Sequence, residues 1–150
     1  NTGEARFTRL VISDKTGKPV KDIFYKSKFT FNMELEVLKK LTHVMVDVKI
    51  SSRDGIVITH SLTHFDDYKI KELSVGKHSI EAEFENNLLP GGYSITIGIH
   101  SATTGTATID YLENVSEFTV LSIAEPGQNN YPFNWVYGSI NPKTTWKINA

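Results

Sequence analysis

Hydrophobic and polar residues alternate along much of the chain, with an apolar side chain at every second position. In the segment 29–37 the apolar positions are Phe29, Phe31, Met33, Leu35 and Val37. The same period of two occurs in the segments 44–50, 80–85, 93–100 and 118–120, which are rich in β-branched and aromatic residues. Each segment therefore predicts a β-strand with one buried face and one face in water.

Turn-forming residues separate these segments. They are the stretch 14–19, Arg53-Asp54-Gly55, Asn86-Asn87, Pro90-Gly91-Gly92 and Thr104-Gly105, the last as the tip of a hairpin. A further strand is expected near 7–12, and no long amphipathic helix is predicted. Several short strands at this spacing favour an all-β, antiparallel sandwich or barrel. The length of 150 residues suits one such domain.

The turn at residues 53–55 allows two registers between the strands that flank it. A two-residue loop would place apolar residues opposite polar ones, namely Ile50 opposite Thr59 and Val48 opposite Ser61. A three-residue loop keeps the apolar side together and uses Gly55 as its left-handed residue. We therefore predict the second register, with the pairs Ile50–Ile58, Val48–His60, Val46–Leu62, Lys49–Thr59, Asp47–Ser61 and Met45–Thr63.

The alternation stops near Ser122, and the remaining chain has a different character. A stretch with Pro126, Gly127 and Pro132 is typical of a linker, and strongly apolar residues follow it. We expect a β-sandwich domain over residues 1–122 and an apolar arm over residues 123–150, buried on its own sandwich or on a partner. The aromatic residues expected at a dimer interface are Trp135, Tyr137 and Trp146. For Trp146, a stacking platform for a sugar stays an open alternative.

Composition narrows the classes of function. With a formal net charge of -1, the chain has no general attraction to nucleic acid or to anionic lipid. It has no cysteine, which favours a reducing compartment only weakly, because many bacterial surface domains also lack it. No segment has the roughly 20 apolar residues of a membrane span. Because the chain begins with Asn1 and not with Met, we expect it to be part of a longer protein.

The sequence contains no recognisable catalytic motif. It has no cysteine nucleophile, no Gly-x-Ser-x-Gly turn and no phosphate-binding Gly-x-x-x-x-Gly-Lys-[Ser/Thr] loop. Asp66-Asp67 and the glutamates of 81–85 are acidic pairs that a glycosidase could use, but alternating glutamates are typical of a solvated strand face. His60 and His64 lie near these aspartates without a ligand spacing that suits a strand. We therefore predict a protein that is not an enzyme and that needs no metal and no cofactor.

The order of several short motifs resembles a known family. These motifs are Gly3-Glu4-Ala5-Arg6-Phe7, Asp14-x-x-Gly17-x-Pro19-Val20, Arg53-Asp54-Gly55, Leu88-Leu89-Pro90-Gly91-Gly92-Tyr93, Ile99-His100, Asp110-Tyr111-Leu112-Glu113-Asn114 and Phe118-Thr119-Val120. Over residues 3–121 this order is similar to the C-terminal carbohydrate-binding domain of Wzt, the nucleotide-binding subunit of ABC transporters that export O-polysaccharide.

The resemblance implies an immunoglobulin-like antiparallel β-sandwich that forms a homodimer by exchanging its C-terminal strand. It also implies non-catalytic binding of the non-reducing end of the lipid-linked O-polysaccharide, which selects finished chains for export. A separate ATP-binding domain would hydrolyse ATP and contact the membrane subunit of the transporter. The implied location is the cytoplasm, at the periphery of the bacterial inner membrane, with no nucleic-acid partner.

A candidate carbohydrate-binding face follows from the predicted register. Short polar and charged side chains on a sheet can bond sugar hydroxyls, and the outward positions are Asp47, Lys49, Thr59, Ser61, Thr96 and His100. Gly98 would let a ligand approach the backbone closely. The same positions also suit an ordinary solvated face of an antiparallel sheet. The alternatives to glycan binding are a structural or assembly module, as in phage tails or adhesins, and, ranked last, a glycosidase.

Overall fold

The computed structural model of the chain is built almost entirely from strands, and it describes residues 1–103 and 107–149. The predicted hairpin tip at Thr104-Gly105 lies outside the described residues. The elements are β1 (Ala5–Asp14), β2 (Asp22–Tyr25), β3 (Phe29–Val37), β4 (Leu41–Ser52), β5 (Val57–Leu62), the 3-10 turn η1 (Thr63–Asp66), β6 (Ile70–Leu73), β7 (Gly76–Phe84), β8 (Gly91–Ser101) and β9 (Thr108–Ala124).

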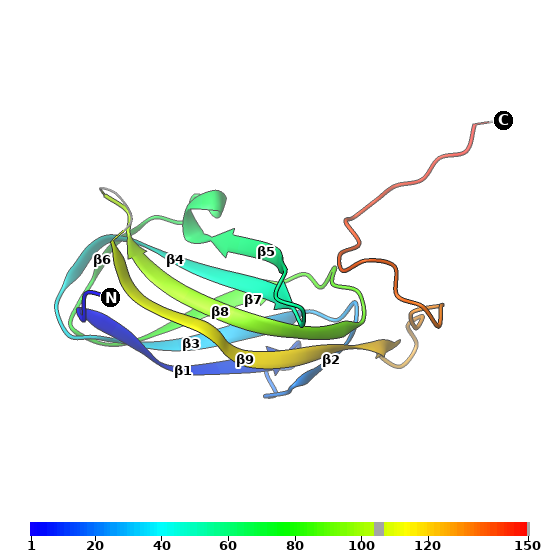
Figure 1. Cartoon of the computed structure of the whole chain (residues 1–150), viewed down its shortest axis with the longest axis horizontal. Helices are drawn as coiled ribbons and strands as arrows, with labels where there is room; N and C mark the ends of the chain where they lie inside the picture. The colour runs from blue at the N-terminus through cyan, green and yellow to red at the C-terminus, as the bar shows by residue number, and fades with distance from the viewer. Residues whose placement is uncertain (104–106, 150) are drawn as a thin grey trace.

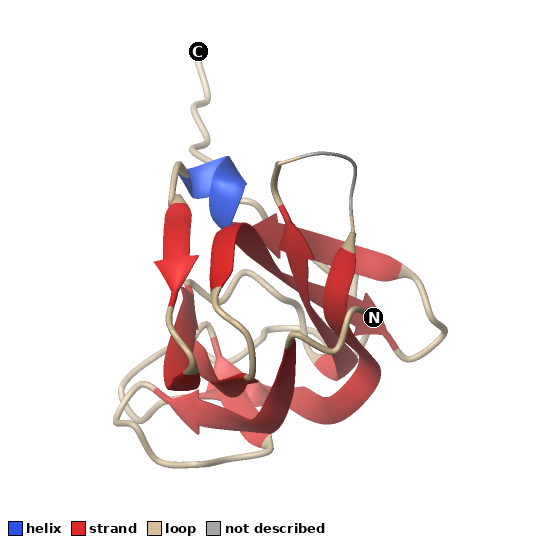
Figure 2. Ribbon diagram, turned by 90° about the vertical axis from the view of Figure 1, so that its left-hand side faces the viewer, coloured by secondary structure: helices blue, strands red, loops and turns tan. Residues whose placement is uncertain are grey.

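These strands form two sheets that pack face to face (Figure 1). The smaller sheet has the order β1-β3-β7, and the larger sheet has the order β2-β9-β8-β4-β5, with β6 also paired to β4. Figure 2 shows the strands wrapped around one interior, with η1 as a short blue turn. The prediction of an all-β sandwich is confirmed, although β2 pairs with β9 in parallel and so makes the larger sheet mixed.

The core between the sheets is built from the alternating segments. β3 buries Phe29, Phe31 and Met33 from the smaller sheet, and β8 buries Ile95 and Ile97 from the larger one, each with at most 1% of its surface exposed. Burying one side chain of this size stabilises the fold by roughly 1.5–3 kcal/mol. The period of two in the sequence therefore corresponds directly to the faces that hold the sheets together.

The predicted register between β4 and β5 is wrong over most of its length. The three-residue turn itself is present, because Ser52 N–H donates to Ile56 O at 2.8 Å and Gly55 has a φ of 84°. A bulge follows immediately, since Ser51 pairs with Val57 whereas Ile50 pairs with Thr59. The extra residue, Ile58, packs against the core instead of opposing Ile50, and this gain of apolar burial shifts the rest of the ladder by one residue.

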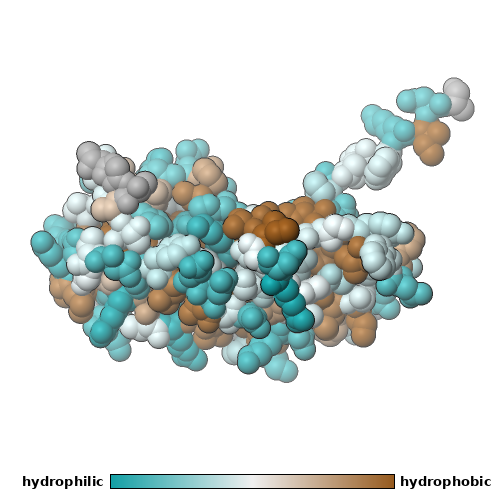
Figure 3. All heavy atoms as spheres, viewed as in Figure 1, coloured by the Kyte–Doolittle hydropathy of each residue, from teal (hydrophilic) through white to brown (hydrophobic). Residues whose placement is uncertain are grey.

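The chain after β9 is only partly attached to the sandwich. It forms a short antiparallel ladder at the end of the molecule, where Leu89 N–H donates to Ser139 O and Asn141 N–H donates to Asn87 O, both at 2.8 Å. Beyond Asn141 the arm leaves the body of the protein, as the trace in Figure 1 and the spheres in Figure 3 show. The arm therefore has an anchored part and a free part.

Candidate functional site

The outer face of the larger sheet brings part of the predicted carbohydrate site together. Across β4 and β8, Asp47 lies opposite Gly98, Lys49 opposite Thr96, and Met45 opposite His100. Because directly opposed residues of an antiparallel pair point to the same side, Asp47, Lys49, Thr96 and His100 share one face. This part of the predicted set is assembled by the fold.

Thr59 and Ser61 do not join that face. They lie opposite Ile50 and Val48, whose side chains point into the core, so both are on the inner side of the sheet. Ser61 lines a groove between the sheets instead of the outer surface. The bulge after the hairpin turn is the physical reason, because a shift of one residue moves every side chain of β5 to the other face.

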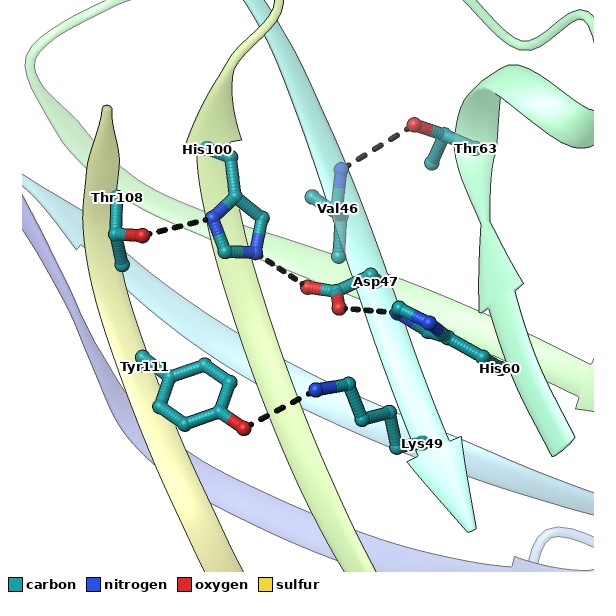
Figure 4. A network of polar contacts seen from close by, with 8 residues as sticks. All are labelled: Val46, Asp47, Lys49, His60, Thr63, His100, Thr108 and Tyr111. Atoms are coloured by element: carbon teal, nitrogen blue, oxygen red, sulfur yellow. Dashed lines mark hydrogen bonds and ion pairs between the residues drawn. The ribbon is translucent and has the colours of Figure 1, made fainter. Parts of the chain in front are cut away.

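The same shift brings His60 onto the outer face, opposite Lys49. His60 Nε2 lies 2.6 Å from Asp47 Oδ2, and His100 Nε2 lies 2.8 Å from Asp47 Oδ1 (Figure 4). Thr108 Oγ1 lies 3.2 Å from the other ring nitrogen of His100. Each imidazole therefore donates from Nε2 to a different oxygen of one carboxylate, which fixes the orientation of both rings.

Asp47 is the centre of this network and is not open to a ligand. Its residue exposure is 4%, and both carboxylate oxygens have a histidine partner. A Cβ added to Gly98 would stand 2.4 Å from Asp47 Oδ1 and 2.7 Å from His100 Nε2. The expectation that Gly98 gives a ligand access to the backbone is therefore wrong, because side chains of the protein fill that space.

Thr96 is also occupied within the protein. Its exposure is 4%, and its hydroxyl oxygen accepts the backbone N–H of Asn114 at 2.9 Å. Asn114 has a φ of 49° and lies where β9 departs from regular pairing with β8. Thr96 thus holds an irregular strand in place, and its hydroxyl is engaged within the protein.

Lys49 and Tyr111 form the accessible part of the face together with His60. Lys49 Nζ donates to Tyr111 Oη at 3.2 Å and lies 5.2 Å from the centre of the ring (Figure 4). Tyr111 lies opposite Gly98 on β9, so no side chain of β8 separates it from Asp47. The candidate site consists of the exposed His60 with the half-buried Lys49 and Tyr111, and the network of Asp47, His100 and Thr108 supports it.

His60 and Tyr111 are site residues that the sequence-based prediction missed. Both positions depend on bulges, one between Ile50 and Ser51 in the β4–β5 pairing and others along the β8–β9 pairing. A regular period of two assigns each residue to one face only as long as the strand has no extra residue. No pattern in the sequence marks where these bulges occur.

Two hollows lie away from this face. The larger, of about 950 Å³, runs between β7 and the segment β5–β6, and its floor includes Val46, Val48, Ile80 and Phe84. The smaller, of about 650 Å³, lies where the arm meets the sandwich, near Asn87 and Trp146. The larger hollow is the open edge of the sandwich, because β7 and β5 are edge strands.

The aromatic residues predicted for a dimer interface are all on the arm and all exposed, with Trp146 at 87%. Tyr131 anchors the first part of the arm, because its hydroxyl donates to Trp135 O at 2.8 Å and accepts Tyr137 N–H at 3.2 Å. Nearby, Tyr93 Oη donates to Leu89 O at 2.5 Å, and burial raises the pKa of Tyr93. The anchored part is thus held by hydrogen bonds to the rest of the chain. Within the described residues, the Trp146 side chain makes no hydrogen bond.

The described residues contain neither a cluster of metal ligands nor a helix that could span a membrane. Within 1–103 and 107–149, no group of three His, Cys, Asp or Glu side chains is arranged to hold a metal ion. Over the same residues, no helix has the length and apolarity that crossing a membrane requires.

Solved structures and sequence families show what the chain is similar to. The crystal structure of the C-terminal domain of Wzt matches with a TM-score of 0.79 and 14% identity, covering 99% of this chain and 86% of that chain. The alkylpurine DNA glycosylase AlkC of Pseudomonas fluorescens, bound to DNA with an abasic site analogue, matches with a TM-score of 0.50 and 14% identity, covering 81% and 31%. At these identities the likeness shows the fold alone.

Among curated protein sequences, no match is found. The family model of the Wzt C-terminal domain, however, matches residues 1–136. This match spans both sheets, the polar network around Asp47 and the anchored start of the arm. The chain belongs to the Wzt C-terminal domain family.

Proposed function

We propose that this chain is a non-catalytic domain that binds the non-reducing end of an O-polysaccharide and thereby selects the polymer for export. Membership of the Wzt C-terminal domain family supports a role in the O-antigen ABC transporter. In this proposal the domain works in the cytoplasm beside the inner membrane. An ATP-binding domain elsewhere in the longer protein hydrolyses ATP and contacts the membrane subunit. The observation that carries the binding proposal is the accessible group of Lys49, His60 and Tyr111.

The chemistry of this group suits a sugar. The ammonium of Lys49 and the ring of His60 can bond hydroxyls, and the Tyr111 ring can stack on an apolar C–H face of a pyranose. Asp47 holds His60 from below, and the Tyr111 hydroxyl accepts a bond from Lys49, so much of the ordering of these side chains precedes binding. Preorganised side chains lose less conformational entropy when a ligand binds.

The same geometry favours recognition over hydrolysis. A glycosidase needs two carboxylates on either side of the scissile bond. Asp47 is buried with both oxygens bonded, so it is not free to exchange a proton with a substrate. The glutamates that the sequence offered as an alternative pair lie on and just after β7, in the other sheet, where Lys28 lies 3.8 Å from Glu83 and 3.2 Å from Glu85.

Titration of the purified domain with a panel of bacterial O-polysaccharides tests the proposal. We expect one polymer to bind, and we expect Lys49→Ala or Tyr111→Ala to weaken that binding about tenfold while thermal unfolding stays unchanged. Lys77→Ala, an exposed lysine on β7 of the other sheet, is the matched control and keeps full affinity. Binding of no polymer in the panel, together with tight binding to a protein, would favour the rival structural module and refute the proposal.

We also propose that the domain, residues 1–122, forms a homodimer through the arm, residues 123–150. Up to residue 149, the free part of the arm has no regular secondary structure, but its sequence has the alternation of an amphipathic strand. Thr144, Trp146 and Ile148 alternate with Lys143, Thr145 and Lys147, so one face is largely apolar and the other carries two positive charges. A segment of this kind presents unpaired N–H and C=O groups to which a neighbouring strand edge can bond, and an apolar face that a groove can bury.

The free edge of β7 in a second copy fits this strand. Along β7, Ile80, Ala82 and Phe84 turn toward the groove between the sheets, and Glu81 and Glu83 are exposed on the other side. We place the arm antiparallel to β7 of the second copy, in the phase that sets Lys147 opposite Glu81 and Lys143 opposite Glu85. In that phase Trp146 and Ile148 enter the groove, and opposite charges meet across the strands. The exchange of equivalent arms gives a symmetric dimer.

Disulfide trapping tests this arrangement. Lys147→Cys in one tagged chain and Glu81→Cys in a second tagged chain are expected to form an interchain disulfide, because directly opposed strand residues have Cα atoms about 5.5 Å apart. Thr8→Cys on β1, at the far edge of the same sheet, replaces Glu81→Cys as the control and stays reduced. A disulfide that forms only when both cysteines are in one chain would show that the arm folds back on its own β7.

A further inference from the structure

We propose that the sugar bound at the Lys49–His60–Tyr111 face is acidic, and that its carboxylate or phosphate lies between the ammonium of Lys49 and the imidazole of His60. The inference rests on the proposed function and names the chemical class of the ligand for that site. It follows from the distribution of charge over the outer face of the larger sheet.

Among the described residues, the charge of Lys49 has no acidic partner. Lys15 and Lys28 have one, at 3.2 Å from carboxylate oxygens of Glu125 and Glu85, and Lys49 differs from other unpaired lysines such as Lys77 in being held in place by the hydroxyl of Tyr111. Within residues 1–103 and 107–149, no acidic side chain lies within 4.0 Å of Lys49 Nζ, whose contact is the neutral hydroxyl of Tyr111. An ammonium held at one place beside a neutral partner is available to an anion from outside.

The carboxylate nearest in sequence on this face does not compete for Lys49. Asp47 stands two residues before Lys49 on the same side of β4, but its oxygens are bonded to His60 and His100 at 2.6 and 2.8 Å. The carboxylate is also almost fully buried. The carboxylate of Asp47 is therefore bonded to the two imidazoles and does not pair with Lys49. The positive charge of Lys49 stays available on the accessible surface.

His60 supplies a second donor beside Lys49. The two residues are directly opposed on β5 and β4, which brings their Cβ atoms to about 5 Å from each other. The side chain of His60 is 38% exposed, and since Nε2 is bonded to Asp47, Nδ1 is the ring nitrogen left for a ligand. The charged groups that face this ring are Asp47 and Lys49 from β4 and, through Asp47, His100 from β8.

An anionic group suits this pair of donors better than a hydroxyl does. A hydrogen bond from a charged donor is roughly twice as strong as a neutral one, and an anionic acceptor adds Coulomb attraction that a hydroxyl lacks. When His60 is protonated, it can donate from Nε2 to Asp47 and from Nδ1 to the ligand at the same time. The Tyr111 ring, 5.2 Å from Lys49 Nζ, then contacts the body of the same sugar.

The test compares one polysaccharide in three chemical forms. The polymer of the panel that binds best is used untreated, after reduction of its carboxyl groups to alcohols, and after removal of its phosphate esters with hydrofluoric acid. We expect one of the two treatments to weaken binding about tenfold in calorimetric titration, and the treatment that does so identifies carboxylate or phosphate as the anion. We also expect Lys49→Ala to weaken binding of the untreated polymer and to leave the treated, weaker-binding polymer unaffected.

The outcomes separate this inference from the proposed function. Equal binding of all three forms, with affinity still lost in Tyr111→Ala, would overturn the acidic ligand and leave glycan binding in place. Binding of no form by the unaltered domain would overturn both. Lys77→Ala controls for a general effect of one removed positive charge, and it is expected to leave the affinities of all three forms unchanged.

Discussion

The outer face of the larger sheet and the free part of the arm are both rich in polar and aromatic residues. They differ in how far their side chains are buried and bonded within the chain. On the face, Asp47 is 4% exposed and bonds two histidines from neighbouring strands. On the arm, Trp146 is 87% exposed, and the C-terminal segment leaves the body of the protein (Figure 3). The polar groups of the face are bonded within one copy of the chain, whereas the largest side chain of the free part is exposed.

This difference separates the two kinds of recognition that we propose. A face whose side chains are already held can bind a small, flexible ligand without spending much of the interaction energy on its own ordering. An arm that orders only on a partner gains its energy from the apolar area it buries there. Substitutions that disturb the buried support around Asp47 should therefore change the stability of a single copy, whereas substitutions at the tip of the arm should change association.

Gly98→Ala is expected to have the largest effect on the face. The new Cβ would stand 2.4 Å from Asp47 Oδ1, so the carboxylate and His100 would both have to move. Forcing extra atoms into a filled site of this kind costs about 1–3 kcal/mol, which should appear as a lower urea midpoint at unchanged slope. A stability equal to that of the unaltered protein would show that the network around Asp47 is not rigid.

Gly92→Ala is the matched control for that experiment. Gly92 is on the same strand, and its added Cβ would meet atoms of the Arg53 side chain, the closest at 1.8 Å. Because that group is the end of a long flexible side chain, it can swing into solvent, and the cost should stay below about 0.5 kcal/mol. The comparison of the two substitutions shows whether the cost of an added Cβ depends on the neighbour being fixed, as Asp47 is, or able to move, as the Arg53 side chain is.

The sandwich could be predicted from the sequence because the core follows a simple period. β3 runs from Phe29 to Val37 with alternating burial, and the alternating segment 29–37 has the same bounds. The parallel pairing of β2 with β9 was not predictable in the same way, since a strand of four residues carries too little pattern. A long strand with one face in the core and the other toward water has a period of two that can be recognised in the sequence.

The site was predictable only where pairing is regular. Asp47, Lys49, Thr96 and His100 fall on one face because β4 and β8 pair without a bulge over that region. Thr59 and Ser61 were placed on the wrong side because the insertion of Ile58 is driven by packing against the core, which the sequence of β5 alone does not reveal. Tyr111 was missed for the corresponding reason on β9.

Tyr131→Phe should have an intermediate effect, confined to the anchored part of the arm. It removes the hydroxyl that bonds Trp135 O and Tyr137 N–H while keeping the ring that packs on Tyr25 at 5.6 Å. The loss of such hydrogen bonds costs about 1 kcal/mol, and amide exchange at Tyr137 and Asn141 should become faster while exchange in β4 and β8 stays the same. Equal acceleration in β4 would show that the arm and the sandwich unfold as one unit.

Trp146→Thr should have the smallest effect on the stability of a single copy and a clear effect on association. Threonine keeps a residue that favours strands, and the indole that it replaces is almost fully exposed, so the free energy of unfolding at dilution should change by less than about 0.5 kcal/mol. Analytical ultracentrifugation over a range of concentrations should show a weaker dimer, because the largest side chain entering the groove on β7 is gone. Thr145→Val, on the opposite face of the same strand, is the control and should leave the dimer intact. If Trp146→Thr leaves the dimer unchanged and instead weakens polysaccharide binding, the arm belongs to the ligand site. That result would refute the assignment of glycan binding to the face and dimerisation to the arm.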